Sequence, residues 1–242
     1  YNRDVEIFPV LNTIFEKIYG ESPYKSPTDM GVNMAGNCIC DDAVCREASC
    51  QEIIRRYYAA LNALLKGDSS DKEAQKIELL MNMAGITIAD RKVAVRALER
   101  AKETCGPAAA LELEDGRIIT GKTTNLLGAS AALLLNVLKE LAGLDHGLHI
   151  ISPESIEPIQ KLKVDYLKSK NPRLHTDEVL IALSASAAAS PQARLALSQL
   201  PKLEGCQAHT SVMLSDVDIK IFKKLGVQLT CEAVYEHNHL YH

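Results

Sequence analysis

Hydrophobic positions recur every three or four residues along much of the chain, which predicts a helix-rich fold. In the first such stretch, from about Phe8 to Tyr19, Val10, Ile14 and Ile18 fall on one face and Gly20 ends the helix. Similar spacing predicts further helices over residues 43–66, 71–85, 90–105, 122–143, 152–170, 176–190, 191–200 and 215–226.

Between residues 107 and 121, hydrophobic residues no longer recur every three or four positions but alternate with polar ones. Leu111 and Leu113 alternate with glutamates, Asp115-Gly116 follows, and two isoleucines come next, which predicts a β-hairpin with its turn at Asp-Gly. Short strands are also expected within residues 206–215 and 227–235. The pattern predicts an α+β or α/β fold, with short strands in one or two small mixed sheets packed by Ala/Leu-rich helices. We expect one compact unit over residues 1–242, with a seam near Gly106.

Composition narrows the class of protein. The 242 residues are 47% hydrophobic and 24% charged, as in an ordinary globular protein. The formal net charge is −4 and no Lys/Arg stripe occurs, so no nucleic-acid partner is expected. The apolar run 129–135 is too short to span a bilayer, so no membrane partner is expected either. Without a secretory signal, the seven cysteines are expected to be free thiols in the cytoplasm.

The segment GRIITGKT, Gly116 to Thr123, fits the phosphate-loop pattern G-x-x-x-x-G-K-[ST]. Its context argues against a nucleotide cradle, because Ile118 and Ile119 favour a strand and Gly116 belongs to the hairpin turn. Lys122 and Thr123 still lie where a strand leads into a helix. They are candidate anion-binding residues there, and the alternative is an ordinary helix cap with a solvated lysine.

The segments SPYKSPTDMGVNMAG, GRIITGKTTNLLGASAALLLN, NPRLHTDEVLIALS and LTCEAVYEHNHLYH resemble the bacterial domain-of-unknown-function 1846 family, and specifically its C-terminal half. The resemblance covers essentially the whole chain. It implies that a longer protein has an N-terminal half of Rossmann or P-loop type, absent here. The resemblance makes that missing half a partner and the main binder of any nucleotide cofactor. The chain begins with Tyr1 rather than Met, which also indicates a fragment or a processed chain.

The loop YKSPTDMGVN concentrates polar side chains between two prolines and a glycine. Lys25 and Ser26 are candidates to hold an anion, and Asp29 to orient them or to act as a base. Thr28 and Asn33 are further candidate ligand-binding residues. The alternative is a structural loop in which Asp29 caps backbone N–H groups.

The segment NPRLHTDE lies at the start of a predicted helix. Arg173 is a candidate clamp for a carboxylate or phosphate, and His175 is a candidate acid–base group because it lies beside carboxylates. The alternative is a structural, hydrogen-bonded histidine.

The segment AHTS offers a third candidate. His209 and Ser211 share one face of a predicted strand, so a histidine–hydroxyl pair or a polar wall of a site is open to them. No orienting acid for such a pair is identifiable in the sequence. No metal site is expected, because the spacing of Cys38, Cys40, Cys45 and Cys50 matches neither zinc nor iron–sulfur motifs.

These patterns predict the substrate-side half of a cytoplasmic enzyme that handles a nucleotide or another phosphorylated or anionic small molecule. The polar loops would converge on one site, and the chain would form a homo-oligomer. The alternative is a non-catalytic oligomerisation or regulatory module. Whether the four loops lie together separates the two hypotheses.

Overall fold

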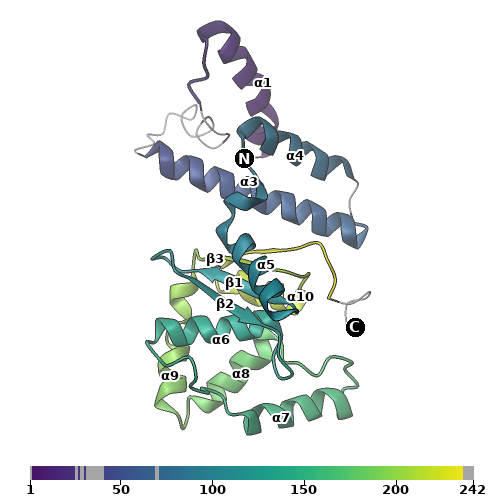
Figure 1. Cartoon of the computed structure of the whole chain (residues 1–242), viewed down its shortest axis with the longest axis vertical. Helices are drawn as coiled ribbons and strands as arrows, with labels where there is room; N and C mark the ends of the chain where they lie inside the picture. Colours follow the sequence, from purple (N-terminus) through teal and green to yellow (C-terminus); the bar gives the residue numbers. More distant parts are fainter. Residues whose placement is uncertain (1, 25–26, 28–29, 31–40, 69–70, 237–242) are drawn as a thin grey trace. The chain divides into compact units, whose positions relative to one another are not determined.

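The computed structural model in Figure 1 describes residues 2–24, 27, 30, 41–68 and 71–236. The chain folds as two compact units, Tyr1–Arg91 and Lys92–His242. The seam expected near Gly106 falls inside the second unit. The expected α+β class is confirmed, with many helices and one small mixed sheet.

The first unit is helical. It contains α1 (Asn2–Tyr19), α3 (Asp42–Lys66), α4 (Asp71–Ala84) and the short η1 (Ile88–Asp90). The long helix expected over 43–66 is confirmed as α3: Asp41 Oδ1 accepts the amide of Val44 at its start, and Gly67 ends it with a φ of 79°. α3 packs against α4 and buries Ile53, Ile54 and Tyr58.

The second unit is built around a four-stranded sheet. Its strands are β1 (Ala108–Glu112), β2 (Ile118–Lys122), β3 (Gln207–Thr210) and β4 (Gln228–Cys231), in the order β2-β1-β3-β4. β1 is antiparallel to β2 and to β3, and β3 is parallel to β4. The helical segments of this unit are α5 (Lys92–Thr104), α6 (Ala129–Leu141), α7 (Pro153–Lys161), η2 (Leu162–Tyr166), α8 (Thr176–Ser186), α9 (Pro191–Leu197), η3 (Leu200–Leu203) and α10 (Asp216–Lys224).

The two faces of the sheet carry different helices. α5 lies on one face, where Val93 and Ala97 pack on Ala110 (Figure 1). α6, α8 and α9 lie on the other face, where Leu111 and Ala208 join the main apolar core. The sheet is therefore buried on both sides by alternate residues of the same strands.

The predicted hairpin is confirmed. Leu113 N donates to Arg117 O at 2.9 Å, and Gly116, with a φ of 82°, occupies the turn. Residues 118–122 of the phosphate-loop pattern form β2. This part of the motif is therefore a β-strand and not a phosphate-binding loop.

α6 begins at Ala129, several residues after the expected start. Thr124 Oγ1 accepts the amides of Leu126 (3.2 Å) and Leu127 (3.0 Å), which holds a turn before the helix. β2 approaches α6 closely: a Cβ added to Gly121 would lie 2.2 Å from Leu133 N. Only glycine fits that contact.

Candidate functional site

Two loops of the second unit pair side by side, and each leads into a helix. Leu174 N donates to Leu126 O at 2.9 Å, Gly128 N donates to Leu174 O at 3.3 Å, and Leu127 and Leu174 form a parallel bridge. α6 and α8 each begin two residues after this bridge. The N-termini of the two helices, where each helix dipole is positive, therefore start next to each other.

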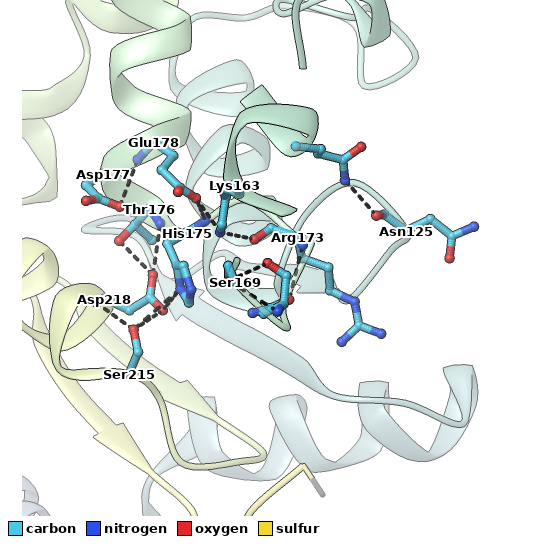
Figure 2. Close-up of polar contacts among 12 residues, drawn as sticks. Asn125, Lys163, Ser169, Arg173, His175, Thr176, Asp177, Glu178, Ser215 and Asp218 are labelled. Atoms are coloured by element: carbon cyan, nitrogen blue, oxygen red, sulfur yellow. Dashed lines mark hydrogen bonds and ion pairs between the residues drawn. The ribbon is translucent and has the colours of Figure 1, made fainter. Parts of the chain in front are cut away.

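His175 stands at the N-cap of α8 and is fixed at two points. Its Nδ1 lies 2.9 Å from Asp218 Oδ2, and its backbone N–H donates to Glu178 Oε2 at 2.8 Å (Figure 2). The side chain is about 29% exposed. The imidazole is thus held in one orientation and remains accessible.

Asp218, in the first turn of α10, holds the imidazole. It is only 3% exposed, and its Oδ1 accepts both the backbone N–H (2.9 Å) and the hydroxyl (2.8 Å) of Thr176. Ser215, the N-cap of α10, donates its hydroxyl to Asp218 Oδ2 at 2.8 Å. A carboxylate with this many donors is a rigid partner for His175.

The pKa values of this pair move apart. The hydrogen bond to Asp218 raises the pKa of His175 above its ordinary value, against the opposing effect of burial. Burial would raise the pKa of Asp218, but the hydrogen bond and charge of His175, with those from Thr176 and Ser215, outweigh it and hold that pKa below its ordinary value. Both shifts favour a charged His175–Asp218 pair.

A second pair supports the same loop. Lys163, 6% exposed, donates its Nζ to Arg173 O at 2.7 Å and to Glu178 Oε2 at 2.8 Å. Lys163 lies in the π-helical turn η2, a type of turn that is frequent at functional sites. Glu178 therefore links Lys163 to the backbone of His175 (Figure 2).

The other predicted site residues near this loop, Arg173, Thr123 and Lys122, lie in different surroundings. Arg173 donates to Glu236 Oε1 at 2.6 Å, so its guanidinium already has a carboxylate partner in the chain. Thr123 N donates to Pro107 O at 2.9 Å. Lys122 is exposed at the end of β2, directly after the glycine that contacts α6. The structure brings the 123–128 and 171–175 segments together.

His209 lies elsewhere. It pairs with Ala110 across the sheet and so points to the α5 face, opposite α6 and α8. It is fully buried, with Nδ1 2.8 Å from Thr230 Oγ1 and Nε2 3.2 Å from Glu232 Oε1. This histidine links β3 to Thr230 in β4 and to Glu232, directly after the end of β4. The sheet separates it from His175.

Ser211 closes the end of the sheet. Its hydroxyl accepts the amide of Ala108 at 3.0 Å, and its own amide donates to Ala108 O at 2.9 Å. The hydroxyl thus serves β1 rather than His209. The remaining expected residues, Lys25, Ser26, Thr28, Asp29 and Asn33, lie outside the described residues.

Two further observations concern metals and membranes. Within residues that the structure describes, no group of three or more His, Cys, Asp or Glu side chains is arranged to hold a metal ion. Among the described helices, none is long and apolar enough to cross a bilayer.

Sequence reasoning missed the partners of His175. Asp218 is 43 residues away, and its sequence signal, Ser215 three residues before it, indicates only a helix cap. Lys163 carries no local signal of burial. These residues become recognisable only when α8, α10 and η2 are placed together.

The chain belongs to the DUF1846 family. The model of its C-terminal domain of unknown function matches residues 89–241, and the model of its N-terminal domain matches residues 1–85. The expectation that the chain holds only the C-terminal half, with the missing N-terminal half as its partner, was therefore wrong. Residues 1–85, which include the segment SPYKSPTDMGVNMAG, match the N-terminal domain and not the C-terminal half to which that segment was assigned.

Curated relatives support the family and carry no stated activity. The chain is 58% identical over 241 residues to a UPF0371 protein of Corynebacterium urealyticum. The aligned region covers 100% of this chain and 48% of the relative. It is 50% identical to a UPF0371 protein of Streptococcus pneumoniae strain JJA, covering 100% of this chain and 49% of the relative. The chain spans about half the length of these relatives.

Proposed function

We propose that this chain belongs to a cytoplasmic enzyme that transfers a proton to or from a small anionic substrate, with His175 as the acid–base group. The observation that carries the proposal is the 2.9 Å contact between His175 Nδ1 and the buried carboxylate of Asp218. An imidazole oriented by a buried acid is a recurrent arrangement for proton transfer.

The geometry assigns the two ring nitrogens different tasks. Nδ1–H donates to Asp218, which fixes the tautomer and leaves Nε2 to exchange a proton with the substrate. No described residue forms a hydrogen bond with Nε2. The hydrogen bond to Asp218 raises the pKa of His175 above its ordinary value, so it favours the protonated imidazole, which can act as a general acid.

The substrate of this proposal is a nucleotide or another phosphorylated small molecule. Its support is the N-terminus of α6, which starts beside α8 and has no acidic residue in its first turn. Helix N-termini favour anions because their free N–H groups and dipole are positive. The N-terminus of α8 already has Asp177, Glu178 and Asp218 as neighbours, so it is the less suitable of the two.

The test combines ligand screening with turnover. Sugar phosphates and nucleoside mono- and diphosphates would be incubated with the protein and followed by phosphorus NMR. We expect conversion of at least one compound by the wild-type chain and its loss in His175→Gln. His149→Gln, at an exposed histidine, should retain activity. A panel that the wild-type chain leaves unchanged, or conversion that survives His175→Gln, contradicts the proposal.

A second candidate function, self-association, is favoured by one surface. Ile7, Val10, Ile14 and Ile18 recur at helical spacing along α1 and are 43–63% exposed. Such a stripe on a helix is typical of an interface. A second copy of the chain would cover it.

Sedimentation velocity tests this candidate. We expect the wild-type chain to sediment as an oligomer and Ile14→Asp as a smaller species. Asn12→Asp, at a polar position of the same helix, is the matched control. A wild-type chain that remains a monomer over a wide concentration range contradicts self-association through α1.

A further inference from the structure

Arg173 and His175 leave one extended segment on the same side. Leu174, which lies between them, forms the bridge to Leu127 and is 1% exposed in the main apolar core. Neighbouring side chains of an extended segment point to opposite sides, so Arg173 and His175 share the side opposite Leu174. In Figure 2 both side chains extend from the segment away from Glu178. A guanidinium and an oriented imidazole therefore stand two residues apart on one side of this segment.

The guanidinium of Arg173 already holds an oxyanion that belongs to the chain itself. Its Nη1 donates to Glu236 Oε1 at 2.6 Å, and the two side chains are 27% and 25% exposed. Described residues engage only Nη1 of this guanidinium, so its other donors remain for a ligand with more oxygens. An ion pair at such partly exposed positions is weak, so another anion can replace Glu236.

The segment that carries Glu236 lies beside the loop that contacts His175. After β4, Val234 O accepts the amide of Met213 at 2.8 Å. Two residues beyond Met213, Ser215 Oγ lies 3.4 Å from His175 Nδ1. This C-terminal segment is therefore fastened next to the residues that hold the imidazole.

We propose that Arg173 binds a phosphoryl group of the substrate and that Glu236 occupies this position in the free chain, so that the substrate binds by displacing the C-terminal segment. A tethered carboxylate competes at a high effective concentration, on the order of millimolar, so the ligand must attract the guanidinium more strongly than a carboxylate does. A phosphoryl group meets this condition, because it carries a charge of about −1.5 to −2 at neutral pH and has more acceptor oxygens. This inference rests on the proposed function for the role of His175, and it adds the residue that binds the anion and the group that the anion replaces.

The first experiment titrates the isotope-labelled chain with inorganic phosphate and follows the Nε–H resonance of Arg173 and the backbone amides. We expect saturable shifts at residues 171–175 of the wild type. Glu236→Gln, which removes the competing charge, should bind phosphate about threefold more tightly. Glu204→Gln, at an exposed position, removes the same charge and should bind phosphate as the wild type does. Resonances that do not respond to phosphate, or equal affinity in Glu236→Gln and the wild type, overturn the inference.

Replacing the arginine tests the other partner of the pair. Arg173→Gln should weaken phosphate binding by about tenfold or more, because charge-assisted hydrogen bonds are lost. Lys170→Gln, at an exposed basic position shortly before it, should bind phosphate nearly as well as the wild type. Circular dichroism checks that both variants are folded. Wild-type affinity in folded Arg173→Gln overturns the inference.

Displacement itself is followed through the motion of the C-terminal segment. We expect phosphate to lower the heteronuclear NOE of residues 235 and 236 in the wild type, because their ion pair is released and fast motion increases. In Arg173→Gln the same NOE should already be low without phosphate. Phosphate that shifts residues 171–175 and leaves the NOE of residues 235 and 236 unaltered overturns the displacement.

Two further comparisons define the ligand and separate this inference from the proposed function. Acetate should displace Glu236 less than phosphate does at equal concentration, and an equal response would overturn the assignment to a phosphoryl group. His175→Gln should still bind phosphate. Phosphate binding at Arg173 together with turnover that does not need His175 would sustain this site and reject the proposed function. Turnover that needs His175 without phosphate binding at Arg173 would do the opposite.

Discussion

The amide of Gly128 donates to the carbonyl of Leu174 at 3.3 Å, and this contact brings together two loops that are almost fifty residues apart. One loop leads into α6, whose N-cap is Gly128. The other leads into α8, whose N-cap is His175. The pairing therefore joins the segment that follows the predicted anion-binding residues Lys122 and Thr123 to the segment of the predicted acid–base group His175.

Removing the charge of Asp218 should destabilise the fold and release His175. We expect Asp218→Asn to lower the free energy of unfolding by about 3 kcal/mol, because a buried carboxylate with four donors is replaced by an amide. The pKa of His175, followed by proton NMR, should fall. Asp216→Asn, at an exposed position in the same turn, should change stability by less than about 1 kcal/mol. An unchanged pKa of His175 in Asp218→Asn would contradict the assigned pairing.

The same pair should make stability depend on pH in a defined window. Since the folded pKa of His175 is raised above 6.5, its stabilising contribution is complete below that pH and is lost as pH rises through the folded value. The folded pKa of Asp218 is lowered below 3.8, so its contribution is present above that pH and is lost as pH falls through the folded value. Two neighbouring charges also act on the pKa of His175: the charge of Lys163 lowers it and the charge of Glu178 raises it.

The measurement is chemical denaturation of the wild type and His175→Gln from pH 4 to pH 9. The difference in unfolding free energy should be largest at about pH 4–6.5 and should shrink above neutral pH. His149→Gln, at an exposed site, should show no such profile. A difference that grows toward alkaline pH would be inconsistent with a raised pKa.

Gly121 should tolerate no side chain. An alanine Cβ would meet Leu133 N at 2.2 Å and Ala129 O at 2.9 Å, both backbone atoms that cannot move without shifting α6. We expect Gly121→Ala to lower the free energy of unfolding by about 3 kcal/mol or more. Gly128→Ala, with an ordinary φ and no contact closer than 3.8 Å, should stay within about 0.5 kcal/mol of the wild type. Equal melting temperatures for the two variants would refute the close approach of β2 and α6.

The buried ammonium of Lys163 should stabilise the loop that precedes α8. Lys163→Met preserves the aliphatic stem but removes the Nζ donor to Arg173 O and to Glu178 Oε2, which keeps the amide of His175. We expect a loss of about 2 kcal/mol, together with faster amide hydrogen exchange at residues 173–175. Lys161→Met, at an exposed position, is the matched control and should be near neutral. Unaltered exchange at 173–175 would show that Lys163 does not hold this loop.

Several features of the fold were accessible from local sequence. The Asp115-Gly116 hairpin and the long helix Asp42–Lys66 follow from turn chemistry and hydrophobic period, because their hydrogen bonds join near neighbours. The helix predicted over residues 215–226 is likewise confirmed as α10. The start of α6 was misjudged, since Thr124 forms a local turn and Leu127 pairs with a residue far along the chain.

For the site, the sequence by itself determined which chemical groups are available: a histidine at a helix start, a lysine after a strand, and serines able to cap or to bind. Only the tertiary structure decided which of them meet. His175 gains Asp218 from α10, whereas His209 is enclosed on the other face of the sheet with Thr230 and Glu232. The physical reason is that these contacts join residues up to 43 positions apart, and sheet register and helix packing set such distances.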